Sequence, residues 1–216
     1  MNAPRTARFL SFEGGEAAGK STQIRLLSER LRSMGLDVVE LREPGGTPIG
    51  EKIRHLLKHD PDGHGMSSES ELLLMNASRA ELVRKVIRPA LEAGRWVVSD
   101  RFFDSTTAYQ GHGRGLDPLQ VRAVIDIAVG PTRPDLTLYL DVDPATARQR
   151  LARRRGDRAE PDRFDEEKDA FFSRVRAGFE SILATEPERI VRVDAGGDVA
   201  TVAAAVWGRL ASRNWV

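Results

Sequence analysis

The chain has 216 residues, which is enough for one substantial hydrophobic core and short for two domains. Its 33 lysines and arginines against 32 aspartates and glutamates leave a net charge of +1, which argues against a protein that works by coating nucleic acid or an acidic membrane. The absence of cysteine excludes disulfides, thiolate metal sites and cysteine nucleophiles.

The first half of the chain alternates short apolar runs with segments of helical period. Ile24, Leu27 and Leu31 recur at spacings of three and four residues before Gly35, which is the pattern of an amphipathic helix with a glycine stop. In chain order we therefore expect a strand at 8–14, a helix at 20–34, a strand at 37–43, a helix at 48–58 and a loop at 59–66.

The second half continues the alternation. It opens with a long helical segment that we expect to bend or end near Pro89, because proline removes a backbone donor and clashes with the preceding turn. In chain order the pattern predicts a helix at 68–93, strands at 95–100, 136–142 and 189–195 with helical stretches between them, and a closing helix at 199–211.

Strands that are nearly all apolar and separated by helices indicate an α/β fold with a parallel sheet, here of five strands, covered by helices on both faces. Ligands of such sheets bind beyond the carboxyl ends of the strands. The loops that leave these ends are therefore the places to look for a site, and they follow Phe12, Arg42, Asp100, Asp141 and Asp194.

The stretch FEGGEAAGKST at 12–22 contains the pattern G-x-x-x-x-G-K-[ST] between a predicted strand and a predicted helix. Its backbone N–H groups and the positive end of the helix dipole suit the phosphates of a nucleoside triphosphate, with Lys20 as a fixed cation and Ser21 as a hydroxyl ligand for magnesium. The alternative is a glycine-rich turn without a ligand. The expected ATP-binding residues are Gly14, Gly15, Glu16, Ala17, Ala18, Gly19, Lys20, Ser21 and Thr22.

Asp100 ends the predicted strand WVVSD and Arg101 follows it directly. An acid at the end of a strand next to the phosphate loop can hold magnesium through water, so Asp100 joins Ser21 as a predicted metal-site residue. Arg101 beside it indicates a second anionic ligand. The alternative interpretation is a surface pair that closes the strand.

The basic run RQRLARRRGDR at 148–158 begins on a predicted helix and breaks at Gly156, where a mobile loop is expected. An arginine delivered by a closing loop can be worth about 10³–10⁵ in the rate of phosphoryl transfer. Closure would also keep water away from the triphosphate. Arginine-rich helices are equally often solvated faces, and that alternative stays open.

The chain resembles the thymidylate kinases over nearly its whole length, in five stretches that occur in the right order: FEGGEAAGKST, REPGGTPIGEKIR, LLLMNASRAEL, SDRFFDSTTAYQGHGRG and RRRGDRAEPDRFD. The fourth stretch is the most specific. The resemblance implies a single P-loop NTPase-fold domain over 1–216 with a mobile lid at about 153–164. It also implies transfer of the γ-phosphoryl group of MgATP to dTMP, and a homodimer without nucleic-acid or membrane partners.

The resemblance also implies roles for individual residues. Glu16 accepts a hydrogen bond from the acceptor's 3′-hydroxyl, and Arg79 contacts a thymine carbonyl. Arg101 lies near the acceptor phosphate, and Tyr109 crowds the ribose 2′ position. The remaining members of the implied dTMP site are Thr106 and Gln110 near base and sugar, and Glu43 and Arg54 flanking the acceptor phosphate.

Two positions depart from the pattern of many relatives. Met75 stands where phenylalanine stacks on thymine; methionine can pack on a ring but offers no flat face, which bears on base affinity and on rejection of dUMP. Ala17 stands where one branch of the family has a P-loop arginine. The chain resembles the bacterial branch whose lid supplies that charge, which makes Arg154 and Arg158 predicted catalytic residues beside Lys20 and Arg101, with Arg163 a further candidate.

Two other functions compete with this interpretation. The nearest is a P-loop kinase for a different deoxynucleoside or nucleoside monophosphate, although Arg101 and Arg54 favour an acceptor that already bears phosphate. The second is a nucleotide-dependent binding protein that uses the arginine run to hold RNA or a partner, which the near-neutral charge disfavours. A GTPase switch is disfavoured because the sequence has no N-K-x-D motif. With no apolar run near the roughly 20 residues needed to span a bilayer, a cytoplasmic protein is expected.

Overall fold

The structure is a computed structural model that describes residues 7–155, 167 and 169–216. Its centre is a sheet of five parallel strands in the order β2-β3-β1-β4-β5, which confirms the predicted architecture. The predicted strands agree with the observed ones to within two residues at each end. The strands are β1 (Phe9–Gly14), β2 (Val38–Arg42), β3 (Trp96–Asp100), β4 (Leu136–Asp141) and β5 (Ile190–Asp194).

Helices connect the strands and cover the sheet. Several of them begin at a side-chain cap: Thr47 accepts from the Gly50 N–H, and Asp198 accepts from the Thr201 N–H. The α-helices are α1 (Lys20–Ser33), α2 (Pro48–Lys58), α3 (Ser68–Leu82), α4 (Arg88–Glu92), α5 (Phe103–Thr106), α6 (Pro118–Val129), α7 (Pro144–Arg155), α8 (Asp169–Thr185) and α9 (Val199–Ala211). A 3₁₀ turn, η1 (Pro61–Gly63), lies in the expected loop, and two π-helical segments are η2 (Val83–Ile87) and η3 (Thr107–Gly113).

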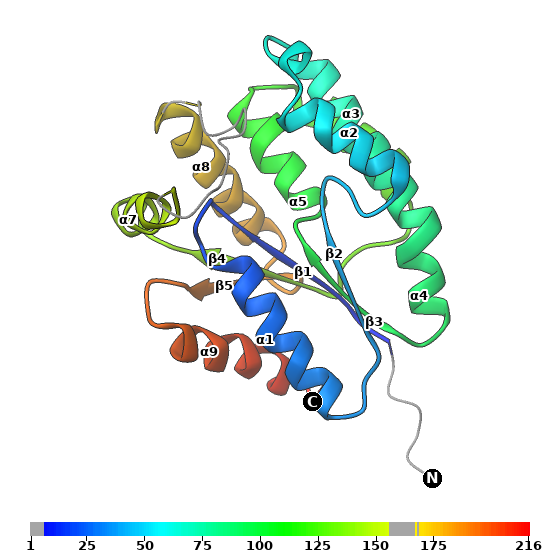
Figure 1. Ribbon diagram of the computed structural model, residues 1–216, viewed down its shortest axis with the longest axis vertical. Helices are drawn as coiled ribbons and strands as arrows, with labels where there is room; N and C mark the ends of the chain where they lie inside the picture. The colour runs from blue at the N-terminus through cyan, green and yellow to red at the C-terminus, as the bar shows by residue number, and fades with distance from the viewer. Residues whose placement is uncertain (1–6, 156–166, 168) are drawn as a thin grey trace.

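Successive residues of a strand point to opposite faces of the sheet, and both faces here are buried. Leu10 of β1 packs in a core with α1 and α9, whereas its neighbour Phe9 packs in a second core with α3 and α6. A third core joins α8 to η3, with Tyr139 stacked on Phe179 at a ring-centroid distance of 4.7 Å. Figure 1 shows α1 and α9 together on one side of the sheet, with α3, α4, α5 and α8 on the other.

The long helical segment passes through Pro89 and ends three residues later, at Glu92, in agreement with the expected end near that proline. The π-helical η2 provides the physical reason that the helix passes the proline. Arg88, directly before the proline, donates its N–H to the Val83 carbonyl five residues back, which widens the turn that the proline ring must fit. The wider turn lets the chain remain helical through a residue that has no backbone donor.

The basic run starts on α7 as predicted, and α7 is described as far as Arg155. The predicted lid over about 153–164 falls almost wholly on residues that the structure does not describe. Arg158 and Arg163 lie outside the described residues, and so does the side chain of Arg154. Among the helices that are described, none is long and apolar enough to cross a membrane.

Candidate active site

The loop between β1 and α1 has the backbone that a phosphate cradle needs. Gly14 has φ of 137°, and a Cβ there would lie 2.5 Å from the Leu140 carbonyl oxygen, so only glycine fits beside β4. Gly19 has φ of 89° and precedes α1 without a side-chain cap, which leaves the first N–H groups of the helix available to an anion. Ala17 between them is also left-handed, with φ of 53°.

Lys20 lies at the bottom of this loop and is 8% exposed. Its Nζ donates to the Gly14 and Gly15 carbonyl oxygens at 3.2 and 2.9 Å. Burial, with the positive charge of Arg101 as the second cause, lowers the pKa of Lys20 to about 8. The negative charge of a bound phosphate would offset both effects and favour the charged form of Lys20.

A cavity of about 690 Å³, partly open to solvent, lies on one side of the loop and is lined by Ala17, Ala18, Gly19, Lys20, Ser21, Thr22 and Arg150. Arg150 comes from α7 and donates to the Ala195 and Gly197 carbonyl oxygens at 2.9 and 3.2 Å. The sequence analysis placed it in the basic run without singling it out. No local feature of the run RQRLARRRGDR distinguishes it from the neighbouring arginines.

Ser21 and Asp100 meet beside this cavity, as predicted for a metal site. Ser21 Oγ donates to Asp100 Oδ2 at 3.2 Å, although the two residues are far apart in sequence. No group of three or more acidic or histidine side chains that could hold a metal occurs in the part of the chain that the structure describes. One carboxylate and one hydroxyl fit Mg²⁺, which keeps several waters and takes its other ligands from substrate phosphates.

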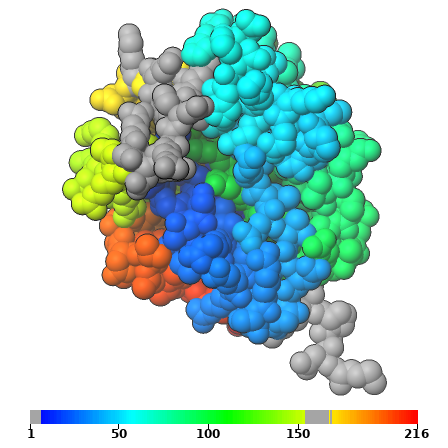
Figure 2. All heavy atoms as spheres, viewed as in Figure 1, coloured from blue at the N-terminus to red at the C-terminus, as the bar shows by residue number. Residues whose placement is uncertain are grey.

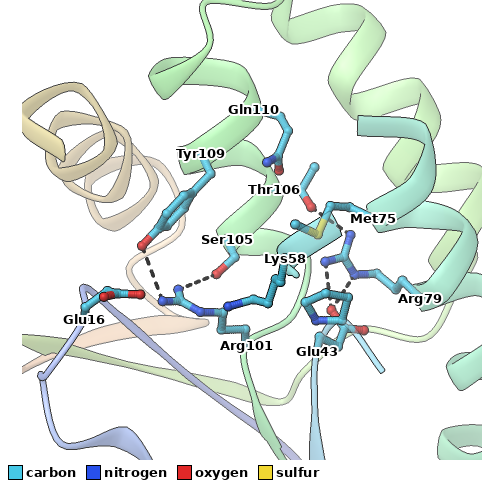
Figure 3. A pocket seen from close by; sticks show the side chains of 11 residues that line it. Glu16, Glu43, Lys58, Met75, Arg79, Arg101, Ser105, Thr106, Tyr109 and Gln110 are labelled. Atoms are coloured by element: carbon cyan, nitrogen blue, oxygen red, sulfur yellow. Dashed lines mark hydrogen bonds and ion pairs between the residues drawn. The ribbon is translucent and has the colours of Figure 1, made fainter. Parts of the chain in front are cut away.

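A second cavity of about 510 Å³, also partly open to solvent, lies on the other side of the loop (Figure 3). Glu16, Arg101 and Tyr109 gather at one end of it, whereas Met75 and Arg79 lie at the other. In the space-filling view a hollow opens between the blue N-terminal residues and cyan α2 and α3, with green atoms at its floor (Figure 2). The cavity is lined by Glu16, Glu43, Pro44, Lys58, Met75, Arg79, Arg101, Ser105, Thr106, Tyr109 and Gln110.

Arg101 forms the end of this cavity nearest the loop. It has φ of 72°, a left-handed conformation that non-glycine residues rarely adopt and that often occurs at functional sites. Its Nη1 donates to Ser105 Oγ at 3.0 Å and its Nη2 to the Tyr109 hydroxyl at 3.3 Å. Tyr109 is 8% exposed, so its ring forms a fixed wall beside the guanidinium.

Arg79 forms the opposite end and is held on all sides. Its Nη1 donates to Asn76 Oδ1 and to Thr106 Oγ1, both at 2.8 Å, and its Nη2 to the Phe102 carbonyl at 3.2 Å. Its Nε donates to Glu43 Oε2 at 2.8 Å. Glu43 therefore lies with Arg79, whereas the resemblance grouped it with Arg54 near the acceptor phosphate.

Gln110 is fixed from behind the cavity. Its Nε2 donates to Glu71 Oε1 at 2.8 Å, and Glu71 is also paired with Arg114 at 2.9 Å. Thr106, Tyr109 and Gln110 come from α5 and the π-helical η3, at spacings that put them on one side of the helix. Pro44 and Met75 add apolar surface to the same cavity, and polar groups beside apolar surface suit a flat ring with polar edges.

Besides Glu43, Glu16 and Arg54 lie differently from the expectation, and three lining or supporting residues were missed in addition to Arg150. Glu16, predicted for both nucleotides, lines the second cavity. Arg54 belongs to the described residues but not to the lining of either cavity; its Nη1 donates to the Pro44 carbonyl at 2.9 Å and so supports the wall. The sequence analysis missed Lys58 and Ser105, which line the second cavity, and Glu13, which lies beneath it.

The two cavities share the phosphate loop as a common wall, with a buried lysine on one side and an arginine on the other. Lys20 and Arg101 are close enough for the charge of one to lower the pKa of the other. Such an arrangement can bring two phosphorylated ligands together end to end and offset the repulsion between them. The chemistry that fits is transfer of a phosphoryl group from a triphosphate to a second anion.

Comparisons with known proteins agree with this geometry. The family model described as thymidylate kinase matches residues 12–206. A thymidylate kinase of Synechococcus sp. (strain JA-3-3Ab) is 49% identical over 201 residues, covering 92% of this chain and 93% of that protein. A thymidylate kinase of Alkalilimnicola ehrlichii is 49% identical over 205 residues, which cover 95% of this chain and 93% of that protein. The crystal structure of thymidylate kinase from Ehrlichia chaffeensis is similar with a TM-score of 0.75 at 34% identity, covering 95% of this chain and 98% of that one.

Proposed function

The chain belongs to the thymidylate kinase family and transfers a phosphoryl group from ATP to dTMP, and we propose which of its residues carry out this reaction. The observation that carries the proposal is the pair of cavities on either side of the phosphate loop, one containing Lys20 and the other Arg101. ATP occupies the first cavity and dTMP the second. Their phosphates meet at the loop.

In the reaction an oxygen of the dTMP phosphate attacks the γ-phosphorus of ATP. A P–O bond forms to the acceptor, the bond to the β-phosphate oxygen breaks, and dTDP and ADP result. Because the attacking oxygen is already ionised, no side chain has to remove a proton. Catalysis then consists of positioning and charge neutralisation, for which Lys20 on the donor side and Arg101 on the acceptor side are placed.

Magnesium fits the donor cavity through Ser21 and Asp100, whose oxygen atoms lie 3.2 Å apart. When bound, the ion neutralises charge on the β- and γ-phosphates. Ser21 would supply a hydroxyl and Asp100 a carboxylate to hold the ion. Arg150 lies at the same cavity, anchored to the loop that follows β5, and would contact the part of ATP that points away from the phosphates.

The far end of the acceptor cavity holds the base. Gln110 is fixed by Glu71 and can present an amide edge to thymine. Arg79 is bound by Glu43, Asn76, Thr106 and the Phe102 carbonyl, so it would exchange one of these partners for a thymine carbonyl. Thr106 lies between Gln110 and Arg79, and Met75 packs on the ring. At the near end, Glu16 accepts from the 3′-hydroxyl and Tyr109 crowds the ribose 2′ position.

The remaining positive charge comes from the arginines at the end of the basic run. The phosphate loop carries Ala17 where a further cation would otherwise stand, and this supports a lid that delivers the charge. We assign that role to Arg154 and Arg158, with Arg163 as a third candidate, in a single domain over 1–216 whose lid covers about 153–164. Replacing each in turn by alanine identifies the one whose loss lowers kcat most while leaving KM for dTMP unchanged.

Exposed apolar side chains support a homodimer. Leu73 on α3 is 57% exposed, and Leu119 and Ile127 on α6 are 78% and 83% exposed. Large exposed apolar groups on neighbouring helices are typical of protein interfaces. Light scattering during gel filtration is expected to give twice the chain mass, reduced to the chain mass by Ile127→Glu but not by Val199→Glu on α9. A wild-type monomer would contradict the dimer. We place the protein in the cytoplasm, where both nucleotides occur.

Separation of the products by anion exchange tests the reaction. With MgATP and dTMP the protein is expected to form dTDP and ADP in equal amounts. Thymidine should remain unphosphorylated, because it brings no phosphate to Arg101. Phosphorylation of thymidine in preference to dTMP would instead establish a deoxynucleoside kinase. Slow hydrolysis of ATP that no monophosphate changes would favour the nucleotide-dependent binding protein.

A further inference from the structure

Glu13 is the last residue before the phosphate loop and has 0% of its surface exposed. Its Oε1 accepts from the Phe102 N–H at 2.7 Å and from the Ser105 N–H at 3.3 Å. Its Oε2 accepts from Ser105 Oγ at 2.6 Å. On the other side, Ser11 Oγ makes only a long contact of 3.5 Å with Oε1. The carboxylate therefore binds mainly the segment that follows Arg101.

The left-handed backbone of Arg101 is held on both sides. Before it, the Arg101 N–H donates to the Phe12 carbonyl at 2.9 Å, and the Arg101 carbonyl accepts from Ser99 Oγ at 2.7 Å. After it, the first N–H belongs to Phe102 and is bound by Glu13. A conformation of this kind persists only where its surroundings determine it. Two side chains complete those surroundings, Ser99 at the Arg101 carbonyl and Glu13 at the Phe102 N–H.

The same carboxylate lies among the charges of the site. Glu13 Oε2 is 4.0 Å from Arg101 Nη1, and Ser105 Oγ accepts from that same Nη1 at 3.0 Å. Asp104 of α5 and Lys20 of α1 are the other charged groups that act on it. Burial and then Asp104 raise the pKa of Glu13 to about 7, and Arg101 opposes them. Glu13 therefore orients the Arg101 guanidinium in two ways, through the hydroxyl of Ser105 that lies between them and by its own negative charge.

We propose that Glu13 is a positioning residue that fixes the turn at Arg101 and so aims the guanidinium at the acceptor phosphate. The proposal rests on the proposed role of Arg101. It links the donor and acceptor sides of the site physically, because Glu13 is joined directly to Gly14 of the phosphate loop. One buried side chain, Glu13, then fixes the position of Arg101 relative to the phosphate loop.

A double-mutant cycle tests whether Glu13 acts through Arg101. Glu13→Ala and Arg101→Ala, singly and together, are assayed for kcat and for KM of dTMP and of ATP. We expect Glu13→Ala alone to lower kcat/KM for dTMP by roughly 10- to 100-fold, with KM for ATP changed less than about threefold. In the Arg101→Ala background, adding Glu13→Ala should lower kcat/KM for dTMP by less than a further factor of about three.

Two further variants keep the result interpretable. Glu13→Gln retains an oxygen for the Phe102 N–H and should recover most of the activity, and it replaces Glu13→Ala in the cycle if the alanine variant does not fold. Ser11→Ala removes only the long contact to the same carboxylate and should behave like the wild type. The proposal would be overturned if Glu13→Ala lowered kcat/KM for dTMP equally in the wild type and in Arg101→Ala. It would also be overturned if Glu13→Ala caused no loss in the wild type. A wild-type protein inactive on dTMP would overturn the proposed function instead.

Discussion

Arg79 and Glu43 form an ion pair within the wall of the acceptor cavity: Nε and Nη2 of Arg79 each lie 2.8 Å from Glu43 Oε2, and only 3% of either side chain is exposed. The second carboxylate oxygen, Glu43 Oε1, is buried without a hydrogen-bond partner among the described residues. Two residues that the resemblance assigned to separate parts of the substrate are therefore one unit. This unit fixes Arg79 at the end of the acceptor cavity that includes Met75.

Breaking the pair is expected to destabilise the fold as well as weaken binding. In Glu43→Gln the guanidinium of Arg79 stays buried without its counter-ion, and losing one partner of a buried pair costs about 3–5 kcal/mol of unfolding free energy. Urea unfolding monitored by circular dichroism measures the change. Glu29→Gln removes the same charge from the exposed pair with Arg25 and should cost less than about 1 kcal/mol. If both variants lost the same unfolding free energy, burial of the pair between Arg79 and Glu43 would make no difference to stability.

The lowered pKa of Lys20 predicts that binding of MgATP is linked to proton uptake. The free protein loses the Lys20 proton as pH rises through about 8, whereas the phosphates of bound ATP favour the charged form. Affinity should therefore fall as pH rises through this value, with roughly half a proton taken up per ATP at the midpoint. Calorimetry in two buffers of different ionisation enthalpy measures the uptake.

Lys20→Arg is the control for that measurement, because arginine stays charged at every accessible pH. The variant should bind ATP without the linked uptake. If uptake of the same size persists in the variant, the proton goes to another group and the assignment to Lys20 is wrong.

Met75 predicts how the acceptor cavity distinguishes bases. Replacing it by phenylalanine provides a flat face for the thymine ring, and aromatic pairs of this kind are worth about 0.5–1.5 kcal/mol. We expect Met75→Phe to lower KM for dTMP by roughly two- to tenfold, since 1.4 kcal/mol is a factor of ten. Met75→Leu, which fills a similar volume without a ring, should leave KM within about twofold. A rise in KM with phenylalanine would mean that the pocket has no room for the ring.

Lys58 extends the acceptor cavity beyond the residues that the sequence analysis selected. It lies in the last turn of α2, one turn beyond Arg54, and enters the cavity between Met75 and Arg101 (Figure 3). We expect Lys58→Met to raise KM for dTMP by roughly five- to tenfold and to leave KM for ATP unchanged, because a cation is lost beside a dianionic substrate. Lys52→Met on the exposed side of the same helix is the matched control. If both variants have the wild-type KM, Lys58 is only part of the wall.

The parts of the site that the sequence predicts are those coded by contiguous residues. The phosphate loop needs glycine at Gly14 and Gly19 and a lysine at the start of α1, and all three lie within seven residues. The sheet was predictable for a similar reason, since each strand is one short segment of mainly apolar residues. The π turn before Pro89 was not predictable, because it is a tertiary accommodation rather than a local preference.

The rest of the site depends on contacts between distant segments. In the sequence, Glu13 is an ordinary residue at the end of a strand. Only the pairing of β1 with β3 brings the segment after Arg101 to its carboxylate. Arg150 is one arginine among several until α7 meets the loop after β5. Glu43 was grouped with Arg54 by its motif, yet its partner comes from α3. The residues of each such pair are far apart in the sequence and meet only once the chain has folded. A local sequence pattern therefore does not reveal the pair.

The central claim is that this protein phosphorylates dTMP, and the most direct measurement is the rate of ADP release from MgATP with each of several acceptors. The panel is dTMP, dUMP, thymidine, AMP and no acceptor. Rapid turnover with dTMP, slower turnover with dUMP and background rates with the others are predicted, because the cavity has a phosphate end at Arg101 and a base end at Arg79. Background rates with all five would contradict the account.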